Sequence, residues 1–213
     1  VGFDMPGETN RQVELTEDKA NRAPMPEDLR DSMPYIQELV RGCKIPVLGV
    51  EGYEADDVIG TLAKKAEKEG YTTYMVTPDK DYGQLLSDKI YMYKPARMGN
   101  GIDIVGPKDF CEKYGLERPE QFIDILGMWG DAVDNIPGIP GVGEKTAIKF
   151  VQEYGSMEGL YENTDKLKGK IKEKVEANKE QALMSKMLAT IITDVPIEFD
   201  EEDLIMEEPN KDA

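Results

Sequence analysis

Acidic side chains gather at three points in a chain of 213 residues that contains no histidine. The three clusters are Glu54-Ala55-Asp56-Asp57, Asp79-Lys80-Asp81, and Asp131 with Asp134. Histidine is the commonest general base and the commonest transition-metal ligand, so other groups must fill both roles here. Carboxylate oxygens that act together favour hard cations such as Mg²⁺ or Mn²⁺. The pattern therefore indicates chemistry that depends on a divalent ion.

Each cluster alone also has a simpler structural explanation. Acidic residues in the first turn of a helix, as at residues 54–57, are stabilised by the helix dipole and by free backbone N–H groups. Asp79 and Asp81 would form a solvated turn, although residues two apart in an extended segment also point the same way. Asp131 and Asp134 share one face of a helical turn and would merely repel each other slightly in solvent. Taken singly, each cluster fits the structural explanation better.

The three clusters together argue for a metal site. Each lies at the boundary of a predicted element, and the carboxyl edge of a parallel sheet is where α/β proteins place ligands. Carboxylates packed together at that edge would repel one another strongly unless cations neutralised them. Two divalent ions roughly 4 Å apart can activate a water and stabilise the leaving oxygen of a phosphodiester without any histidine. We therefore expect a two-metal site that hydrolyses phosphodiesters.

A glycine-rich stretch, residues 136–146, is the second candidate site, and its sequence is IPGIPGVGEKT. Gly138, Gly141 and Gly143 let the backbone turn tightly and approach a partner closely. The helix that begins near Glu144 presents free N–H groups, which suit a phosphate. A hairpin of this kind grips a nucleic-acid backbone without reading its sequence. A tight connection between two helices is the simpler alternative, but the full string after an Asp-rich turn favours DNA binding.

Hydrophobic periodicity predicts a scaffold in two parts for these groups. Strands and helices alternate in the first part, which predicts a parallel α/β sheet, and helices dominate after Pro107. The expected helices cover residues 25–42, 55–69, 81–86, 107–114, 119–129, 144–154 and 174–190. The expected strands cover residues 45–50, 72–77, 89–93 and 102–105, and residues 1–4 resemble the end of a buried strand. Residues 5–33 are largely polar and are expected outside the core.

The composition limits the class of protein. With 39% hydrophobic residues, the chain can bury a core as one domain or as one domain with a subdomain. The net charge of −17 has the wrong sign for general attraction to a polyanion, but metal ions and local basic patches can offset it. The isolated cysteines, Cys43 and Cys111, indicate a reducing compartment. No apolar run approaches ~18 residues and no signal peptide is visible, which predicts no membrane span.

Three motifs resemble those of the 5′-nuclease (flap endonuclease) superfamily, and within it the 5′–3′ exonuclease domain of bacterial DNA polymerase I. They are Glu54-Ala55-Asp56-Asp57-Val58-Ile59-Gly60, Asp79-Lys80-Asp81 with Gln84-Leu85, and the run from Gly130 to Gly138. The motifs occur in the order that the family has, and the likeness covers nearly the whole chain. The resemblance implies a PIN-like parallel sheet with flanking helices, followed by a helical subdomain with a helix–hairpin–helix-type (H3TH) DNA-binding element.

The resemblance also implies a role for each matched position. The catalytic carboxylates would be Glu54, Asp56, Asp57, Asp79 and Asp81. The metal ligands would be the same five residues, with Asp131 and Asp134 at an outer ion and with Asp4. The residues that bind DNA would be Arg11, Lys19 and Arg22 in an arch-like segment, and Gly138, Gly141, Gly143, Lys145 and Thr146 in the hairpin. The implied cofactors are two or more Mg²⁺ or Mn²⁺ ions, with K⁺ at the glycine hairpin.

The implied function is that of a structure-specific 5′–3′ exonuclease and flap endonuclease. Such a hydrolase removes 5′ flaps or RNA primers during DNA replication and repair, as part of a DNA polymerase I. The implied partner is a 5′-flap, nicked or branched DNA duplex, and the protein would be a monomer in the bacterial cytoplasm. The expected domains are a nuclease core at 1–106 with its arch-like segment at 5–33, a helical DNA-binding subdomain at 107–198, and an acidic tail or linker at 199–213.

The sequence departs from the family pattern at two places. The family begins with a hydrophobic strand that ends in an aspartate, and this strand lies upstream of Val1. The arch of the family carries aromatic residues where this chain has Asn10 and Asp18. The first departure suggests an alternative, a catalytically impaired fragment that binds DNA junctions. A ribonuclease of the PIN-like fold is a third possibility, and the glycine hairpin argues against it because that element suits duplex DNA.

Overall fold

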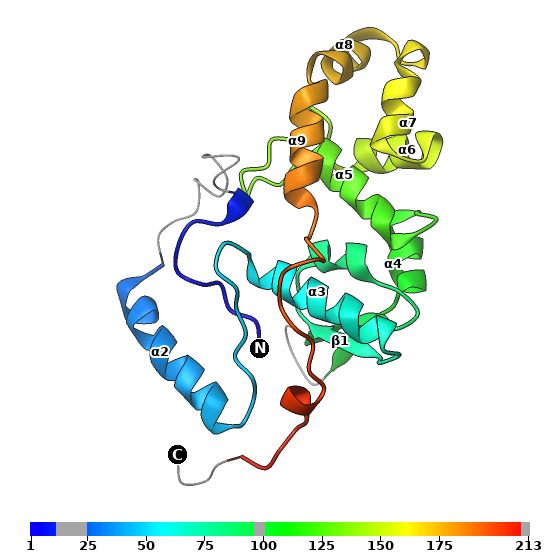
Figure 1. Cartoon of the computed structure of the whole chain (residues 1–213). Helices are drawn as coiled ribbons and strands as arrows, with labels where there is room; N and C mark the ends of the chain where they lie inside the picture. The colour runs from blue at the N-terminus through cyan, green and yellow to red at the C-terminus, as the bar shows by residue number, and fades with distance from the viewer. Residues whose placement is uncertain (12–24, 96–100, 210–213) are drawn as a thin grey trace.

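The computed structural model of the chain describes residues 1–11, 25–95 and 101–209, and they form an α/β half and a helical half (Figure 1). The α/β half contains helix α3 (Ala55–Lys68), the 3₁₀ helix η1 (Lys80–Leu85) and a three-stranded sheet. Buried residues of both halves belong to one hydrophobic core, which includes Met75 and Met92 from the sheet and Phe122 from the helical half. This shared core holds the two halves together.

The sheet contains strands β1 (Thr73–Val76), β2 (Ile90–Pro95) and β3 (Ile102–Val105) in that order. β1 and β2 are parallel, as expected for an α/β fold, and β3 runs antiparallel to β2, as the short connection between them requires. The parallel order brings the residues that follow β1 to the carboxyl edge of the sheet. η1, which carries Asp81, begins at that edge.

Helix α3 carries the first acidic cluster at its N-terminal end. Glu54 is the N-cap, and its backbone N–H donates to Asp57 Oδ2 at 3.2 Å. Asp56 and Asp57 occupy the first turn, where the helix dipole favours negative charge. The buried face of the helix includes Val58 and Ala63, and α3 packs against β1. Burial of this face fixes the position of the acidic turn relative to the sheet.

The helical half is built around α5 (Phe122–Trp129), which packs against α6 (Glu144–Tyr154) and α9 (Lys179–Ala189). The remaining helices of this half are α4 (Pro107–Tyr114), α7 (Met157–Glu162) and α8 (Gly169–Ala177), with 3₁₀ helices η2 (Pro119–Gln121) and η3 (Thr164–Lys166). A further 3₁₀ helix, η4 (Glu202–Leu204), lies in the C-terminal segment beside the α/β half (Figure 1). After α9 the chain runs back across α3 (Figure 1). The end of α9 therefore lies beside the acidic turn of the α/β half.

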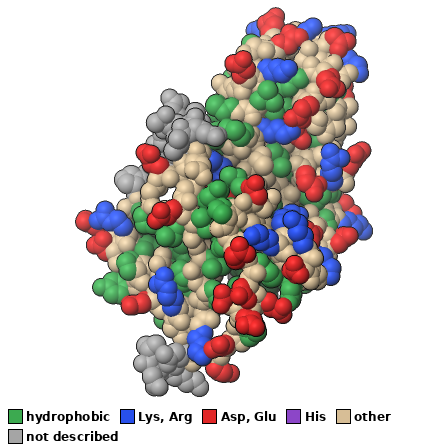
Figure 2. All heavy atoms as spheres, in the orientation of Figure 1, with side chains coloured by type: hydrophobic (Ala, Val, Ile, Leu, Met, Phe, Trp, Pro, Cys, Tyr) green, Lys and Arg blue, Asp and Glu red, His purple; other side chains and the backbone are tan. Residues whose placement is uncertain are grey.

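Helix α2 (Glu27–Gly42) stands apart from both halves (Figure 1). None of its residues is buried, and Tyr35 and Leu39 are 73% and 70% exposed. Figure 2 shows hydrophobic side chains at the surface in the region of this helix. The helical spacing in this segment is confirmed, but the side chains that produce it do not enter the core.

Two expectations about the elements are wrong. Residues 45–50 form no regular strand, and only Leu48 makes a parallel bridge, to Gly2. Pro46 lacks a backbone N–H group, which limits the pairing of this segment. The helix expected over 174–190 is broken near Asn178, which ends α8 and precedes α9. No helix among the described residues has the length and apolar character needed to span a membrane.

Candidate active site

A small cavity of about 20 Å³ lies where α3, η1, the loop after α5 and the end of α9 meet. A cavity of this size is on the order of the volume that one water molecule needs. It is lined by Arg11, Glu54, Asp56, Asp81, Asp134, Ile136, Leu188, Ala189 and Ile191. Four carboxylates from all three acidic clusters therefore converge on one cavity, as the sequence predicted for the clusters as a group.

Asp81 is a cavity carboxylate that is largely removed from solvent. Its Oδ1 atom is buried without a hydrogen-bond partner among the described residues, although Lys80 Nζ lies 3.2 Å away. Burial raises the pKa of Asp81 to about 6, and the attraction of Lys80 only partly offsets this effect. A buried carboxylate that is only partly neutralised by one ammonium group is suited to bind a further cation.

Lys80 joins Asp81 to the outer acidic cluster. Its Nζ lies 2.9 Å from Asp131 Oδ2 and 5.5 Å from the ring centroid of Trp129. Burial alone would lower the pKa of Lys80, but the hydrogen bond to Asp131 and the charge of Asp81 outweigh it, so the pKa is raised. The pKa of Asp131 is lowered, because hydrogen bonds from Lys80 and from the backbone of Val133 outweigh its burial. Lys80 therefore stays protonated between two carboxylates.

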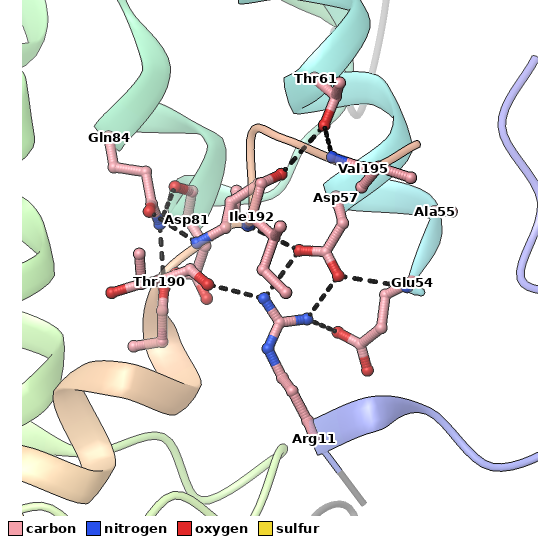
Figure 3. Close-up of polar contacts among 12 residues, drawn as sticks. Arg11, Glu54, Ala55, Asp57, Thr61, Asp81, Gln84, Thr190, Ile192 and Val195 are labelled. Carbon is pink, nitrogen blue, oxygen red and sulfur yellow. Dashed lines mark hydrogen bonds and ion pairs between the residues drawn. The ribbon is translucent and has the colours of Figure 1, made fainter. Parts of the chain in front are cut away.

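Asp57, in the same helical turn as Asp56, points towards Arg11 and Ile192 (Figure 3). Arg11 NH2 donates to its Oδ1 at 2.7 Å, and Arg11 NH1 donates to its Oδ2 at 2.9 Å. Arg11 NH1 also donates to Glu54 Oε2 at 2.8 Å. The pKa of Arg11 is raised, because the hydrogen bonds and charges of Asp57 and Glu54 outweigh its burial. Asp57 is 1% exposed and does not line the cavity.

Four of the eight predicted ligands lie outside the cavity lining, namely Asp57, Asp131, Asp4 and Asp79. Asp4 is exposed, and its Oδ1 accepts a hydrogen bond from the backbone N–H of Ala55 at 2.8 Å. Asp79 is also exposed and accepts from the backbone N–H of Asp81 at 3.0 Å. Across residues 1–11, 25–95 and 101–209, no group of three acidic or cysteine side chains is already arranged to hold a metal ion. The ligand assignments implied by the resemblance stay predictions.

Two side chains of α9 hydrogen-bond to the backbone of the glycine hairpin. Gly138 has φ of +60°, and a Cβ atom there would lie 2.5 Å from the backbone N of Gly130. Its N–H donates to Ser185 Oγ at 3.0 Å, and its carbonyl accepts from Gln181 Nε2 at 2.7 Å. Because the backbone approach is so close, only glycine fits at this position. These contacts tie the hairpin to the helix whose other end reaches the cavity.

Ile136, Ile139 and Val142 of the hairpin are buried in the core, whereas Gly141, Gly143 and Lys145 are exposed. Gly141 has φ of +84°, and Gly143 is the N-cap of α6 and has no atom within 4 Å of its Cβ position. Lys145 is exposed, and Thr146 is half-buried in the first turn of α6. The N-terminus of α6 and Lys145 are therefore accessible to an anion.

The basic residues predicted for the arch are only partly described. Arg11 is 8% exposed, and its guanidinium is bound to Asp57, Glu54 and the carbonyl of Thr190. It is therefore not presented to a ligand in solvent. Lys19 and Arg22 lie outside the described residues, as does Asp18.

Sequence reasoning missed three polar residues that build the site from within. Thr61 and Gln84 are buried and hydrogen-bond the segment after α9, and Ser185 holds the hairpin. Thr61 lies four residues after Asp57, so helical spacing places both on the buried face of α3. This spacing is the signal that could have found the pair. Gln84 belongs to the second motif, but its partners after α9 are distant in the sequence, and no local signal marks Ser185.

Comparison with known families agrees with this arrangement. A family model described as the 5′–3′ exonuclease N-terminal resolvase-like domain matches residues 1–115. A second model, the 5′–3′ exonuclease C-terminal SAM fold, matches residues 117–212. Together the two models span the α/β half and the helical half.

Curated relatives include DNA polymerase I of Bacillus subtilis (strain 168), 48% identical over 199 residues. Thermostable DNA polymerase I of Thermus aquaticus is 47% identical over 182 residues. The alignments cover 93% and 85% of this chain but only 22% and 21% of those proteins. The chain therefore spans about a fifth of the length of these two relatives.

Solved structures show the same fold. T5 5′-exonuclease with bound zinc has a TM-score of 0.76 and 24% identity, over 89% of this chain and 73% of that chain. The catalytic core of Rad2 in complex with a DNA substrate has a TM-score of 0.62 and 16% identity, over 98% of this chain and 68% of that chain. The family models, the curated relatives and the fold agree, and the chain belongs to the 5′–3′ exonuclease family.

Proposed function

We propose that the protein is a metal-dependent, structure-specific 5′ nuclease that hydrolyses phosphodiester bonds of branched DNA. The observation that carries the proposal is the convergence of Glu54, Asp56, Asp81 and Asp134 on one cavity. The family supports the reaction class, and the substrate and setting come from relatives that are DNA polymerase I. On the same basis we expect removal of 5′ flaps or RNA primers by a monomer in a bacterial cytoplasm.

The cavity residues fit divalent cations by their chemistry. All four carboxylates offer hard oxygen ligands, and Asp81 Oδ1 is buried with an ion pair to Lys80. We infer that Glu54, Asp56, Asp81 and Asp134 supply ligands for Mg²⁺ or Mn²⁺, with one ion at the cavity and at least one more beside it. Such ions, when bound, supply charge neutralisation for the phosphodiester and lower the pKa of the attacking water. Asp4, Asp79 and Asp131 stay predictions as further ligands.

The protein residues around the cavity have their own tasks in this proposal. Lys80 holds Asp81 and Asp131 in place and keeps one positive charge beside the cavity. Leu188 and Ile191 border the carboxylates on the side of α9 and limit the access of bulk water. The hydrophobic border strengthens the electrostatic interactions inside the cavity, because it lowers the local dielectric constant.

The glycine hairpin supplies the DNA contact in this proposal. The first turn of α6 and the exposed Lys145 would bind phosphates of the duplex, and we expect a K⁺ ion at the hairpin carbonyls. Solved T5 flap endonuclease and Rad2 structures include complexes with DNA, which supports duplex binding by this fold. The division into a nuclease core at 1–106, a DNA-binding subdomain at 107–198 and a tail at 199–213 is part of the same proposal.

Cleavage of a labelled 5′-flap duplex tests the function. We expect cleavage with Mg²⁺, none in EDTA, and a 5′-phosphate on the product. Asp81→Asn should slow cleavage by on the order of 100-fold or more, because it removes a ligand of the ions that act on the reacting phosphate. Asp88→Asn, a change at an exposed carboxylate of the same half, is the matched control and should cleave normally. Equal rates for the two variants would exclude the cavity as the active site, and binding without cleavage by the wild type would favour a DNA-junction binding protein.

A further inference from the structure

Asp57 has its hydrogen-bonding capacity filled by the protein itself. Its Oδ1 accepts from Arg11 NH2 at 2.7 Å and from the backbone N–H of Ile192 at 2.8 Å. Its Oδ2 accepts from Arg11 NH1 at 2.9 Å and from the backbone N–H of Glu54 at 3.2 Å. Four donors to one carboxylate that is 1% exposed leave little room for a metal ion.

The partners of Asp57 belong to three separate parts of the chain. One of them is an irregular segment, residues 190–195, which we call the strap and which follows α9 across α3 (Figures 1 and 3). Arg11 NH2 also donates to the carbonyl of Thr190 at 2.6 Å. Thr61 Oγ1 donates to the carbonyl of Ile192 at 3.3 Å and accepts from Val195 N at 3.1 Å. Side chains of the α/β half thus replace the backbone pairing that the strap lacks.

Helix α9, which leads into the strap, connects the hairpin to the cavity. Gln181 and Ser185 of α9 hold Gly138 of the hairpin, and Leu188 and Ala189 at the end of α9 line the cavity. Gln84 fixes this end by donating to the carbonyl of Ala189 at 3.0 Å. A shift of α9 would therefore move the hairpin and the cavity wall together.

We propose that Asp57 is a positioning residue and not a metal ligand. Together with Arg11 it anchors Glu54 and the strap, and thereby sets the cavity carboxylates relative to the DNA-binding hairpin. Binding of a metal ion by Asp57 would displace Arg11 and leave a buried guanidinium without its main partner, which is strongly unfavourable. The inference rests on the proposed function for the identity of the ions, but the contacts of Asp57 do not depend on them.

Asp57→Asn and Asp56→Asn form a matched pair for the test, because the two residues are adjacent and only Asp56 lines the cavity. The first measurement is thermal unfolding of both variants in EDTA. Asp57→Asn should lower the melting temperature by on the order of 10 °C, because it breaks a buried ion pair. Asp56→Asn should leave the melting temperature nearly unchanged or raise it, because it relieves repulsion among the cavity carboxylates.

The second measurement is a calorimetric titration with Mn²⁺, well below the melting temperatures. If Asp57 is a positioning residue, the Asp57→Asn variant should bind the wild-type number of Mn²⁺ ions. Its affinity for them should be about 10-fold weaker, since groups that orient ligands affect metal affinity to this degree. Asp56→Asn should bind fewer ions. Loss of an ion by Asp57→Asn with an unchanged melting temperature would overturn the proposal, as would wild-type affinity, which would make Asp57 merely structural.

A double variant covers the case in which Asp57→Asn fails to fold. Arg11→Gln with Asp57→Asn replaces the ion pair by two neutral amides, which can still hydrogen-bond each other. It should fold and bind the wild-type number of Mn²⁺ ions with weakened affinity, and loss of an ion would again count against the inference. If the wild type binds no Mn²⁺, the proposed function is wrong, and so is the proposed effect of Asp57 on metal binding. The melting temperatures in EDTA still decide whether Asp57 anchors the strap.

Discussion

The carboxylate cavity and the glycine hairpin are built by opposite means. The cavity gathers four acidic side chains from segments far apart in the sequence, and burial raises the pKa of one of them, Asp81, although it is paired with Lys80. The hairpin relies on backbone geometry, with Gly138 in a left-handed conformation and bound to two polar side chains of α9. One region is electrostatically strained, whereas the other is sterically tight and has its polar groups satisfied.

This difference determines how each region should respond to change. Removal of a charge from the cavity should stabilise the metal-free protein while it abolishes the chemistry, a trade between stability and activity that is common at functional sites. Addition of one methyl group to the hairpin should destabilise the protein without touching any charge. The two regions can therefore be tested separately, by substitutions with opposite effects on stability.

The largest effect on stability is expected for Gly138→Ala. The new Cβ would lie 2.5 Å from Gly130 N, and φ of +60° is unfavourable for alanine. The free energy of unfolding should fall by about 3 kcal/mol or more, from steric overlap and backbone strain together. Urea unfolding measures this loss of free energy. Gly143→Ala, at an open N-cap position, is the control and should change the free energy by less than about 1 kcal/mol. Equal stability of the two variants would contradict the close approach at Gly138.

A smaller effect of opposite sign is expected for Asp81→Asn in EDTA. Burial raises the pKa of Asp81 to about 6 in the folded protein, above the value of about 4 in an unfolded chain. Ionisation therefore opposes folding, so the stability contributed by this group is complete below about pH 4 and is lost as the pH rises through about 6. Asp81→Asn should raise the free energy of unfolding by about 2 kcal/mol at pH 8 and by nothing at pH 4.

Urea unfolding across this pH range checks the prediction for Asp81. Asp88→Asn, at an exposed carboxylate, serves as the control and should show no such pH-dependent gain. A variant of Asp81 that is less stable than the wild type at about pH 8 would show that the carboxylate is well satisfied in the folded protein. The cavity would then lack the electrostatic strain that distinguishes it from the hairpin.

The smallest effect is expected for Lys145→Ala, which should weaken DNA binding with little change in stability. Loss of one phosphate contact should reduce the slope of log affinity against log salt by about 1. Binding to a flap duplex at several salt concentrations, in EDTA, measures that slope. Lys108→Ala, at an 86% exposed lysine of α4, is the control. An equal change in both variants would mean that the hairpin makes no specific phosphate contact.

Local patterns in the sequence predict most of the elements but fewer of the contacts. Helix α3 was predictable because its apolar residues repeat with helical spacing and Gly70 follows it. The break at Asn178 was not, since no glycine or proline marks it. Convergence of Asp56, Asp81 and Asp134 was predictable as a group from their positions at element boundaries. The different surroundings of Asp57 depend on Arg11 and on the strap, which are remote in the sequence, so only a three-dimensional structure reveals them.

Single-turnover cleavage of a 5′-flap duplex at saturating protein tests the separation of chemistry from binding most directly. The comparison is between Asp56→Asn, in the cavity, and Lys145→Ala, in the hairpin. The account predicts that Lys145→Ala recovers the wild-type rate once all the DNA is bound. It predicts that Asp56→Asn stays slower by on the order of 100-fold, because its defect lies in the chemical step. A wild-type cleavage rate for Asp56→Asn would contradict the separation of chemistry from binding. So would a rate for Lys145→Ala that stays as low as that of Asp56→Asn when all the DNA is bound.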